Sequence, residues 1–151
     1  MRRLIEARAA LDLGTAPLEQ LTVVELLADP DVLAGQLHRL ARRRDHLLQR
    51  LAAELPAFQV RRPGGGLSVW AELPEAWSSR LARAAETAGV VVTPGHRFFV
   101  DGGGDRWLRL PYTLEPEVLS DAVHRLARAW QEVAAAPAVS APADRAVKLI
   151  A

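Results

Sequence analysis

Residues 58–72 read Phe-Gln-Val-Arg-Arg-Pro-Gly-Gly-Gly-Leu-Ser-Val-Trp-Ala-Glu, and this stretch decides the fold. On both sides of the proline and glycine run at 63–66, apolar and polar side chains alternate with the period of two that is typical of half-buried strands. The proline and the three glycines favour a turn between the two alternating segments. The stretch therefore predicts a β-hairpin that turns one face toward a core.

Helical patterns lie on both sides of this hairpin. Before it, leucines at steps of three and four predict a long helix over residues 31–55, capped by Asp29 and with Pro30 in its first turn. Arg44 interrupts this leucine stripe, and we expect it either to extend to solvent or to meet a carboxylate from a neighbouring segment. Further helices are expected over residues 4–11, 17–28, 78–88 and 116–133.

Two more short strands complete the expected sheet. They are Val90 to Val92 and Arg106 to Tyr112, and a glycine-rich loop at 101–105 leads into the second. The connections are too few for a doubly wound parallel sheet, so the predicted fold class is α/β of the α+β kind. We expect a small, mainly antiparallel sheet with helices on one face, preceded by N-terminal helices. The side chains expected to face the helices are Phe58, Val60, Leu67, Val69, Ala71, Leu108 and Leu110.

Length and composition narrow the possible classes of protein. The 151 residues predict one domain, residues 1–133, followed by an alanine- and proline-rich tail at 134–151 that we expect to be disordered or loosely docked. With 19 basic and 18 acidic side chains, the chain has no overall field to attract nucleic acid or a membrane surface. It has no cysteine, no membrane-length apolar stretch and no signal-peptide core, so we expect a cytoplasmic protein.

Several motifs that could indicate other chemistries are better explained as structural features. Both glycine runs lack the strand, loop and helix order of a phosphate loop, so they are predicted to be turns. The histidines have no metal-ligand spacing, which predicts no metal site and four surface or structural side chains: His38, His46, His96 and His124. The serines lack a nucleophile frame and have no histidine close in sequence: Ser68, Ser78, Ser79 and Ser120.

Arg109 is the one candidate binding residue. It lies between the core leucines Leu108 and Leu110, so strand alternation places it on the opposite face of the sheet, together with Trp70 and Trp107. A guanidinium held there by a rigid strand is suited to bidentate binding of a carboxylate. The alternative is an arginine that stacks on Trp107. The two tryptophans need cover, either from the N-terminal helices or from a partner.

A series of short motifs occurs along residues 1–133 in a fixed order. They are Asp12-Leu13-Gly14-Thr15 with Gln20, Arg43-Arg44-Asp45 with Leu47, Gly65-Gly66-Leu67 to Trp70, Gly89-Val90 to Pro94-Gly95 with Phe98, and Leu108-Arg109-Leu110. With these motifs the chain resembles class I and II aminotransferases, and most closely the aminotransferase-like domain of MocR-type GntR regulators.

The resemblance implies the C-terminal small domain of a pyridoxal-phosphate-dependent transferase of fold type I. It also implies that Arg109 binds the α-carboxylate of an amino-acid substrate. The family's Schiff-base lysine, phosphate-binding arginine and pyridine-facing aspartate belong to segments that precede Met1. The one lysine here, Lys148, is outside any such motif, so we expect no covalently bound pyridoxal phosphate in this chain alone.

Three functions remain open from the sequence. The first is a truncated aminotransferase domain, inactive without a missing large domain or a homodimer partner. The second is the effector-binding part of a MocR/GntR-type transcriptional regulator, in which nucleic-acid binding would belong to another module. The third is a stand-alone α+β interaction module. None of the three requires this chain itself to bind DNA or a membrane.

Overall fold

The computed structural model describes residues 16–100 and 102–135 of the chain. These residues fall into two compact units, divided between Ala41 and Arg42. The helix predicted over residues 4–11 lies outside the described residues, as does the part of the predicted tail from 136 onward, which includes Lys148. The boundary placed at residue 133 stays a prediction.

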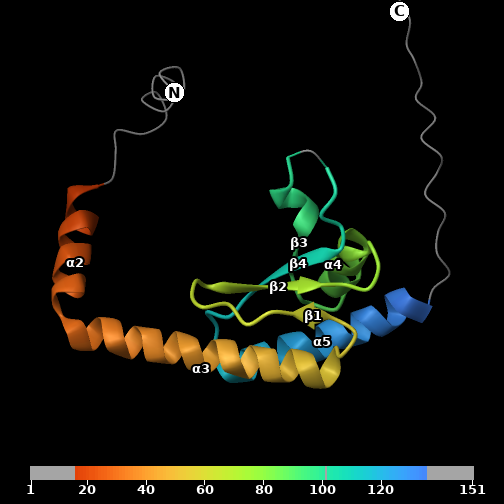
Figure 1. Cartoon of the computed structure of the whole chain (residues 1–151), viewed down its shortest axis with the longest axis horizontal. Coiled ribbons are helices and arrows are strands. Elements are labelled where there is room, and N and C mark those ends of the chain that lie inside the picture. The colour runs from red at the N-terminus through yellow and green to blue at the C-terminus, as the bar shows by residue number, and fades with distance from the viewer. Residues whose placement is uncertain (1–15, 101, 136–151) are drawn as a thin grey trace, which may run out of the picture. The chain divides into compact units, whose positions relative to one another are not determined.

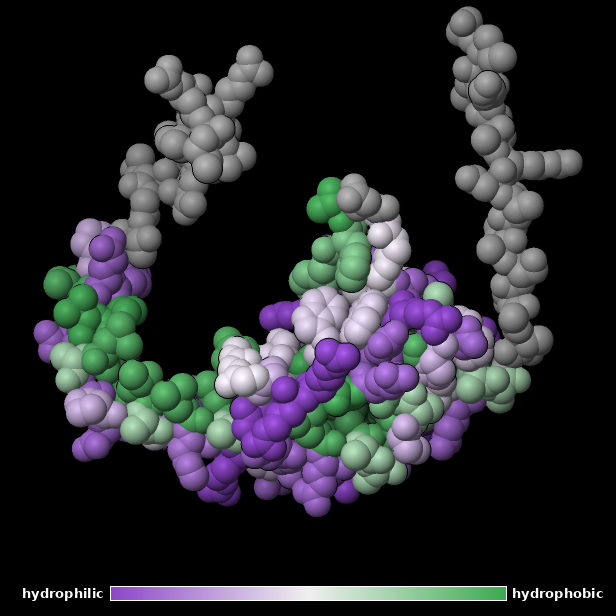
Figure 2. All heavy atoms as spheres, viewed as in Figure 1, coloured by the Kyte–Doolittle hydropathy of each residue, from purple (hydrophilic) through white to green (hydrophobic). Residues whose placement is uncertain are grey.

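The first unit contains α2 (Pro17–Ala28) and the N-terminal part of α3 (Pro30–Glu54). The predicted cap is confirmed, because Asp29 Oδ1 accepts hydrogen bonds from the backbone N–H groups of Asp31 (2.9 Å) and Val32 (3.3 Å). No residue of α2 is buried, and apolar side chains cover much of its surface (Figure 2). A helix this apolar is normally buried in a larger structure. Its large exposed apolar residues are Leu18, Leu21, Val23, Val24, Leu26 and Leu27.

The leucine stripe predicted for the long helix is buried only in part. Leu47 and Leu51, in the second unit, are 3% and 1% exposed. Leu33 and Leu37, in the first unit, are 43% and 58% exposed. The periodicity predicted the helix correctly, but no described residue buries the leucines of its N-terminal half.

The second unit is built on a four-stranded antiparallel sheet of order β1-β2-β4-β3 (Figure 1). The predicted hairpin is confirmed as β1 (Gln59–Val60) paired with β2 (Ser68–Glu72). The next strand in the sheet is β4 (Trp107–Pro111), within the predicted range, and β3 (Thr93–Pro94) is the edge strand beside it. The predicted fold class is thus confirmed.

The prediction of a buried strand at Val90 to Val92 was wrong. Gly89 adopts φ +82°, and the backbone N–H of Val90 still bonds to the carbonyl of Ala85, so the chain is leaving a helix at this point. Pairing with β4 begins only at Thr93, and Val91 is 84% exposed. The sequence run of three valines indicated a strand, but the helix C-terminus delays its start.

Helices cover one face of the sheet. The C-terminal part of α3, α4 (Ser78–Thr87) and α5 (Pro116–Ala135) bury their apolar sides against it (Figure 1). Two of the predicted inward residues are not buried. Val60 is half-buried, and Leu67 is 52% exposed because it precedes the strand ladder, which begins with Ser68 opposite Pro111. Tyr112 holds the turn by donating its hydroxyl to the Gly66 carbonyl. Predicted inward residues that are buried are Phe58, Val69, Ala71, Leu108 and Leu110.

Candidate functional site

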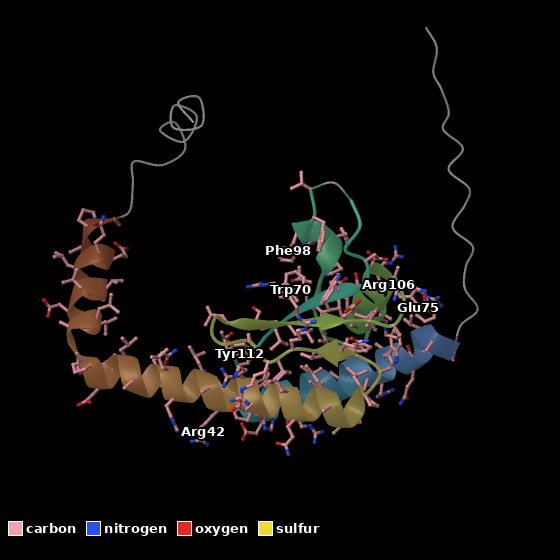
Figure 3. The ribbon with its side chains drawn as sticks, viewed as in Figure 1. Arg42, Trp70, Glu75, Phe98, Arg106 and Tyr112 are labelled. Atoms are coloured by element: carbon pink, nitrogen blue, oxygen red, sulfur yellow. The ribbon has the colours of Figure 1, made fainter. Side chains whose placement is uncertain are left out.

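The second face of the sheet bears the residues that the sequence predicted for it. Within the ladder, Arg109 stands opposite Trp70 on β2 and opposite Thr93 on β3. Trp70 is 37% exposed, and Arg109 and Trp107 are half-buried. We call this face, with Trp70, Trp107 and Arg109, the open face. Trp70 lies on the side of the sheet away from α5, next to Phe98 (Figure 3).

Phe98 is the open-face residue that strand alternation did not predict. Its ring is nearly perpendicular to that of Trp70, with centroids 5.2 Å apart and an interplanar angle of 82°. The Arg109 guanidinium carbon is 5.8 Å from the centroid of the same ring, within cation–π range. The expected alternative for Arg109 was stacking on Trp107, whereas the ring beneath it is Phe98. The resemblance had included Phe98 in its motifs without giving it this role.

The Arg109 guanidinium is available to an external anion. Within residues 16–100 and 102–135, no carboxylate forms an ion pair with it, whereas six other arginines of the unit are paired with acidic side chains. A strand backbone holds the Arg109 stem, and its guanidinium carbon lies over the ring of Phe98. A half-buried guanidinium without an ion-pair partner among the described residues is suited to bidentate binding of a carboxylate.

A close-packed glycine loop brings Phe98 to this position. Phe98 ends the short 3-10 helix η1 (Gly95–Phe98). A Cβ atom added at Gly95 would lie 2.4 Å from the carbonyl oxygen of Gly104, so the two ends of the loop touch at a point where only glycine fits. Gly102, Gly103 and Gly104 all have φ between +77° and +83°, which confirms that this run is a turn.

A hydrogen-bonded cluster anchors the same loop to the start of α4. Asp105 Oδ1 accepts from the Ser78 hydroxyl (2.9 Å), the Ser79 backbone N–H (2.9 Å) and the Ser79 hydroxyl (2.5 Å). His96 Nδ1 is 3.0 Å from the Ser79 hydroxyl oxygen. The sequence did not predict this contact, because His96 lies 17 positions away from Ser79 along the chain.

This cluster is a structural anchor and no activated nucleophile. A serine hydroxyl has one hydrogen, and that of Ser79 is donated to Asp105. His96 Nδ1 must therefore donate to Ser79, which leaves it unable to take the serine's proton. The second histidine–serine contact, His46 to Ser120 at 2.8 Å, joins α3 to α5.

A cavity of about 590 Å³ opens on the open face, on the side of β1 and β2. Two indoles form apolar walls, and polar groups of both charges line the rest. The hydroxyl oxygen of Ser68 is buried there without a hydrogen-bond partner among the described residues. The lining includes Gln59, Arg61, Ser68, Trp70, Glu72 and Trp107.

Arg44 connects α3 to the hairpin through hydrogen bonds. Its Nε donates to Asp45 Oδ1 at 2.9 Å, and its Nη1 donates to the Pro63 carbonyl at 3.2 Å, while Arg62 reaches Asp45 Oδ2 at 2.9 Å. The carboxylate thus comes from the adjacent helix residue and not from a neighbouring segment. The hydrogen bond from Arg44, with help from Arg62, holds the pKa of Asp45 below its usual value.

Other kinds of site can be judged only for the part of the chain that is described. No group of three or more histidine, cysteine or acidic side chains there could hold a metal ion. Residues 16–100 and 102–135 contain no lysine, so they cannot form a Schiff base with pyridoxal phosphate. Within the same ranges, no helix combines the length and hydrophobicity needed to cross a bilayer.

The sequence was compared with protein families and with curated proteins. No family model matches the sequence. A 2-aminoadipate transaminase from Thermus thermophilus is 38% identical over 136 residues, which cover 85% of this chain and 34% of the relative. An LL-diaminopimelate aminotransferase from Oleidesulfovibrio alaskensis is 32% identical over 120 residues, covering 78% of this chain and 30% of the relative. The chain is a relative of aminotransferases.

The structural comparison agrees with the sequence comparison. A crystal structure of an α-aminoadipate aminotransferase from Thermus thermophilus, complexed with N-(5′-phosphopyridoxyl)-L-leucine, matches with a TM-score of 0.76 at 34% identity. The match covers 89% of this chain and 36% of that one. The structural neighbours have the pyridoxal-phosphate transferase fold of type I. The chain therefore spans about a third of the length of the relatives it matches.

Proposed function

We propose that this chain contributes the substrate-carboxylate side of the active site in a pyridoxal-phosphate-dependent aminotransferase, as its C-terminal small domain. The observation that carries the proposal is the Arg109 guanidinium, which has no ion-pair partner among the described residues, is held by β4 and lies over the ring of Phe98. A charge-assisted bidentate pair with an α-carboxylate at this position contributes about 1.5–3 kcal/mol to binding. Trp70 and Trp107 then border the bound amino acid with apolar surface.

Amino-group transfer needs chemistry that the described residues do not contain. Pyridoxal phosphate supplies an electron sink when it is bound, and its lysine and pyridine-facing acid must come from elsewhere. We propose that a large domain supplies them, in the same polypeptide or in a homodimer partner. The exposed apolar surface of α2 is consistent with such a covering structure.

The regulator alternative uses the same site for a different outcome. In that case an amino acid held by Arg109 is an effector, and a separate module binds DNA. The proteins similar to this chain are aminotransferases, which favours the enzyme. The adjoining coding sequence separates the two, since a regulator requires a helix-turn-helix module in the same reading frame.

A chimaeric enzyme tests the proposal. This chain would replace the matching 136-residue region of the Thermus thermophilus 2-aminoadipate transaminase, whose remaining segments carry the rest of the protein. We expect a protein that binds pyridoxal phosphate and transfers amino groups, whereas the host without this region should transfer none. A chimaera that folds, binds the cofactor and transfers no amino group from any amino acid contradicts the proposal.

The isolated chain provides a second test, directed at the cofactor. We expect no internal aldimine with pyridoxal phosphate, because Lys148 is the one lysine of the chain and stands outside any recognisable cofactor motif. Absorbance spectra and borohydride reduction followed by peptide mapping measure this directly. Cofactor trapped on Lys148 at stoichiometric yield overturns the expectation.

A further inference from the structure

Phe98 contacts open-face residues from two different strands. Its ring packs nearly at right angles to that of Trp70 on β2, and Arg109 on β4 lies over the same ring. Phe98 belongs to neither strand, since it ends η1, and its own side chain is 48% exposed. The position of the ring therefore depends on what fixes η1.

The fixed point is the hydrogen-bonded cluster at the start of α4. Asp105 follows the glycine loop and binds the Ser79 backbone N–H and hydroxyl through one carboxylate oxygen. His96, the second residue of η1, reaches the same Ser79 hydroxyl at 3.0 Å. One end of the loop is thus held by Asp105 and the other by His96, two residues before Phe98.

The direction of the bond between His96 and Ser79 is determined by the count of hydrogens. Ser79 gives its only hydroxyl hydrogen to Asp105, so its oxygen can only accept from His96 Nδ1–H. An asparagine amide at position 96 can place a donor where Nδ1 stands. An aspartate of the same shape has no donor and would bring a second negative charge near Asp105, whose Oδ1 is 4.0 Å from His96 Nδ1.

We propose that His96 is a positioning residue for carboxylate binding. Through its hydrogen bond to Ser79 it fixes η1 so that the Phe98 ring covers one side of the Arg109 guanidinium. The covered guanidinium then meets a carboxylate in a preset orientation and loses less conformational freedom on binding. This inference rests on the proposed role of Arg109, and it assigns to His96 a function that its half-exposed surface position does not suggest.

The test uses the full 151-residue chain and two measurements. The first is the side-chain Nε–H resonance of Arg109 in a ¹H–¹⁵N spectrum, assigned by its loss in Arg109→Lys, because the Phe98 ring shields a proton beneath it. The second is the affinity for N-(5′-phosphopyridoxyl)-L-leucine, which carries a free carboxylate next to an apolar side chain. The resonance reports on the position of the Phe98 ring relative to Arg109, and the affinity reports on the effect of that position on carboxylate binding.

Three substitutions at one position separate the hydrogen bond from shape and charge. In His96→Ala and His96→Asp, the Arg109 resonance should move toward the position of an uncovered arginine, and the conjugate should bind about three- to ten-fold more weakly. His96→Asn should retain both the resonance and the affinity of the parent. Phe98→Leu removes the ring without touching the anchor, and it should reproduce the alanine result in a chain with an intact cluster.

An Arg109 resonance that stays unchanged in His96→Ala and His96→Asp overturns the inference. An asparagine variant that behaves like the alanine variant overturns it as well. Arg109→Gln separates failure of the inference from failure of the proposed function. If Arg109→Gln no longer binds the conjugate while His96→Ala binds it with parental affinity, only the positioning role of His96 is wrong. If Arg109→Gln binds like the parent, the carboxylate role is wrong and the inference falls with it.

Discussion

Replacing Asp105 by alanine should destabilise the second unit more than its position in a surface loop suggests. Trp77, which precedes α4, forms no side-chain cap, and Asp105 performs that task from 26 residues away in sequence. The substitution removes a helix cap, which typically costs about 0.5–2 kcal/mol. It also removes the acceptor of the Ser78 hydroxyl, which is fully buried, and a stranded buried hydroxyl costs about 1–3 kcal/mol.

Because Asp105 is about one-third exposed and water can reach Ser79, we expect a total loss of about 2 kcal/mol. Urea unfolding followed by far-ultraviolet circular dichroism measures this loss as a midpoint lowered by roughly 1 M, with an m-value near 2 kcal/mol per M. Asp121→Ala is the matched control, since its exposed i,i+4 pair with Arg125 contributes at most about 0.5 kcal/mol. Equal midpoints for the two variants refute the capping argument.

Three further predictions concern other parts of the second unit. The Arg44 hydrogen bond is the main cause of the lowered pKa of Asp45. The carboxylate therefore stabilises the fold fully above its unfolded-state pKa, and this stabilisation is lost as pH falls through its folded-state pKa. Asp45→Asn should flatten the acid limb of a stability–pH profile. Leu108→Ala removes a fully buried side chain and should cost about 2–5 kcal/mol in urea unfolding. Gly104→Ala should be more destabilising than Gly102→Ala. Both glycines have positive φ, but only a Cβ at Gly104 would clash, 2.5 Å from the Phe99 ring. Equal unfolding midpoints for the two variants would show that backbone strain alone matters.

The sequence was sufficient where a local pattern determines the structure. The alternation around the glycine turn at 63–66 fixes which side chains of β2 face the helices, and the same period places Arg109 on the other face. Helix periodicity and the Asp29 cap likewise predicted α2 and α3 correctly. The strand prediction at 90–92 failed because a helix C-terminus at Gly89, and not the valine run, determines where pairing can begin.

The parts of the candidate site that depend on distant residues could not be predicted. Phe98 meets Arg109 only because a loop with three left-handed glycines folds back onto the sheet. The anchor joins His96, Ser79 and Asp105 from three separate elements, and no spacing in the sequence brings them together. A histidine two residues before a motif aromatic, with a serine pair at a helix start, is the one signal that could have suggested the contact.

The proposed role of Arg109 is tested most directly by two affinities in the aminotransferase chimaera. Arg109→Ala should weaken binding of an amino acid or of N-(5′-phosphopyridoxyl)-L-leucine about ten- to a hundred-fold, the loss expected for a charge-assisted bidentate pair. Affinity for pyridoxal phosphate itself should stay that of the parent, and Arg109→Lys should restore amino-acid binding only in part, since an ammonium lacks the planar fork. Arg125→Ala, on the helix side, should change neither affinity. An Arg109→Ala chimaera that binds amino acids as tightly as the parent would contradict the carboxylate role.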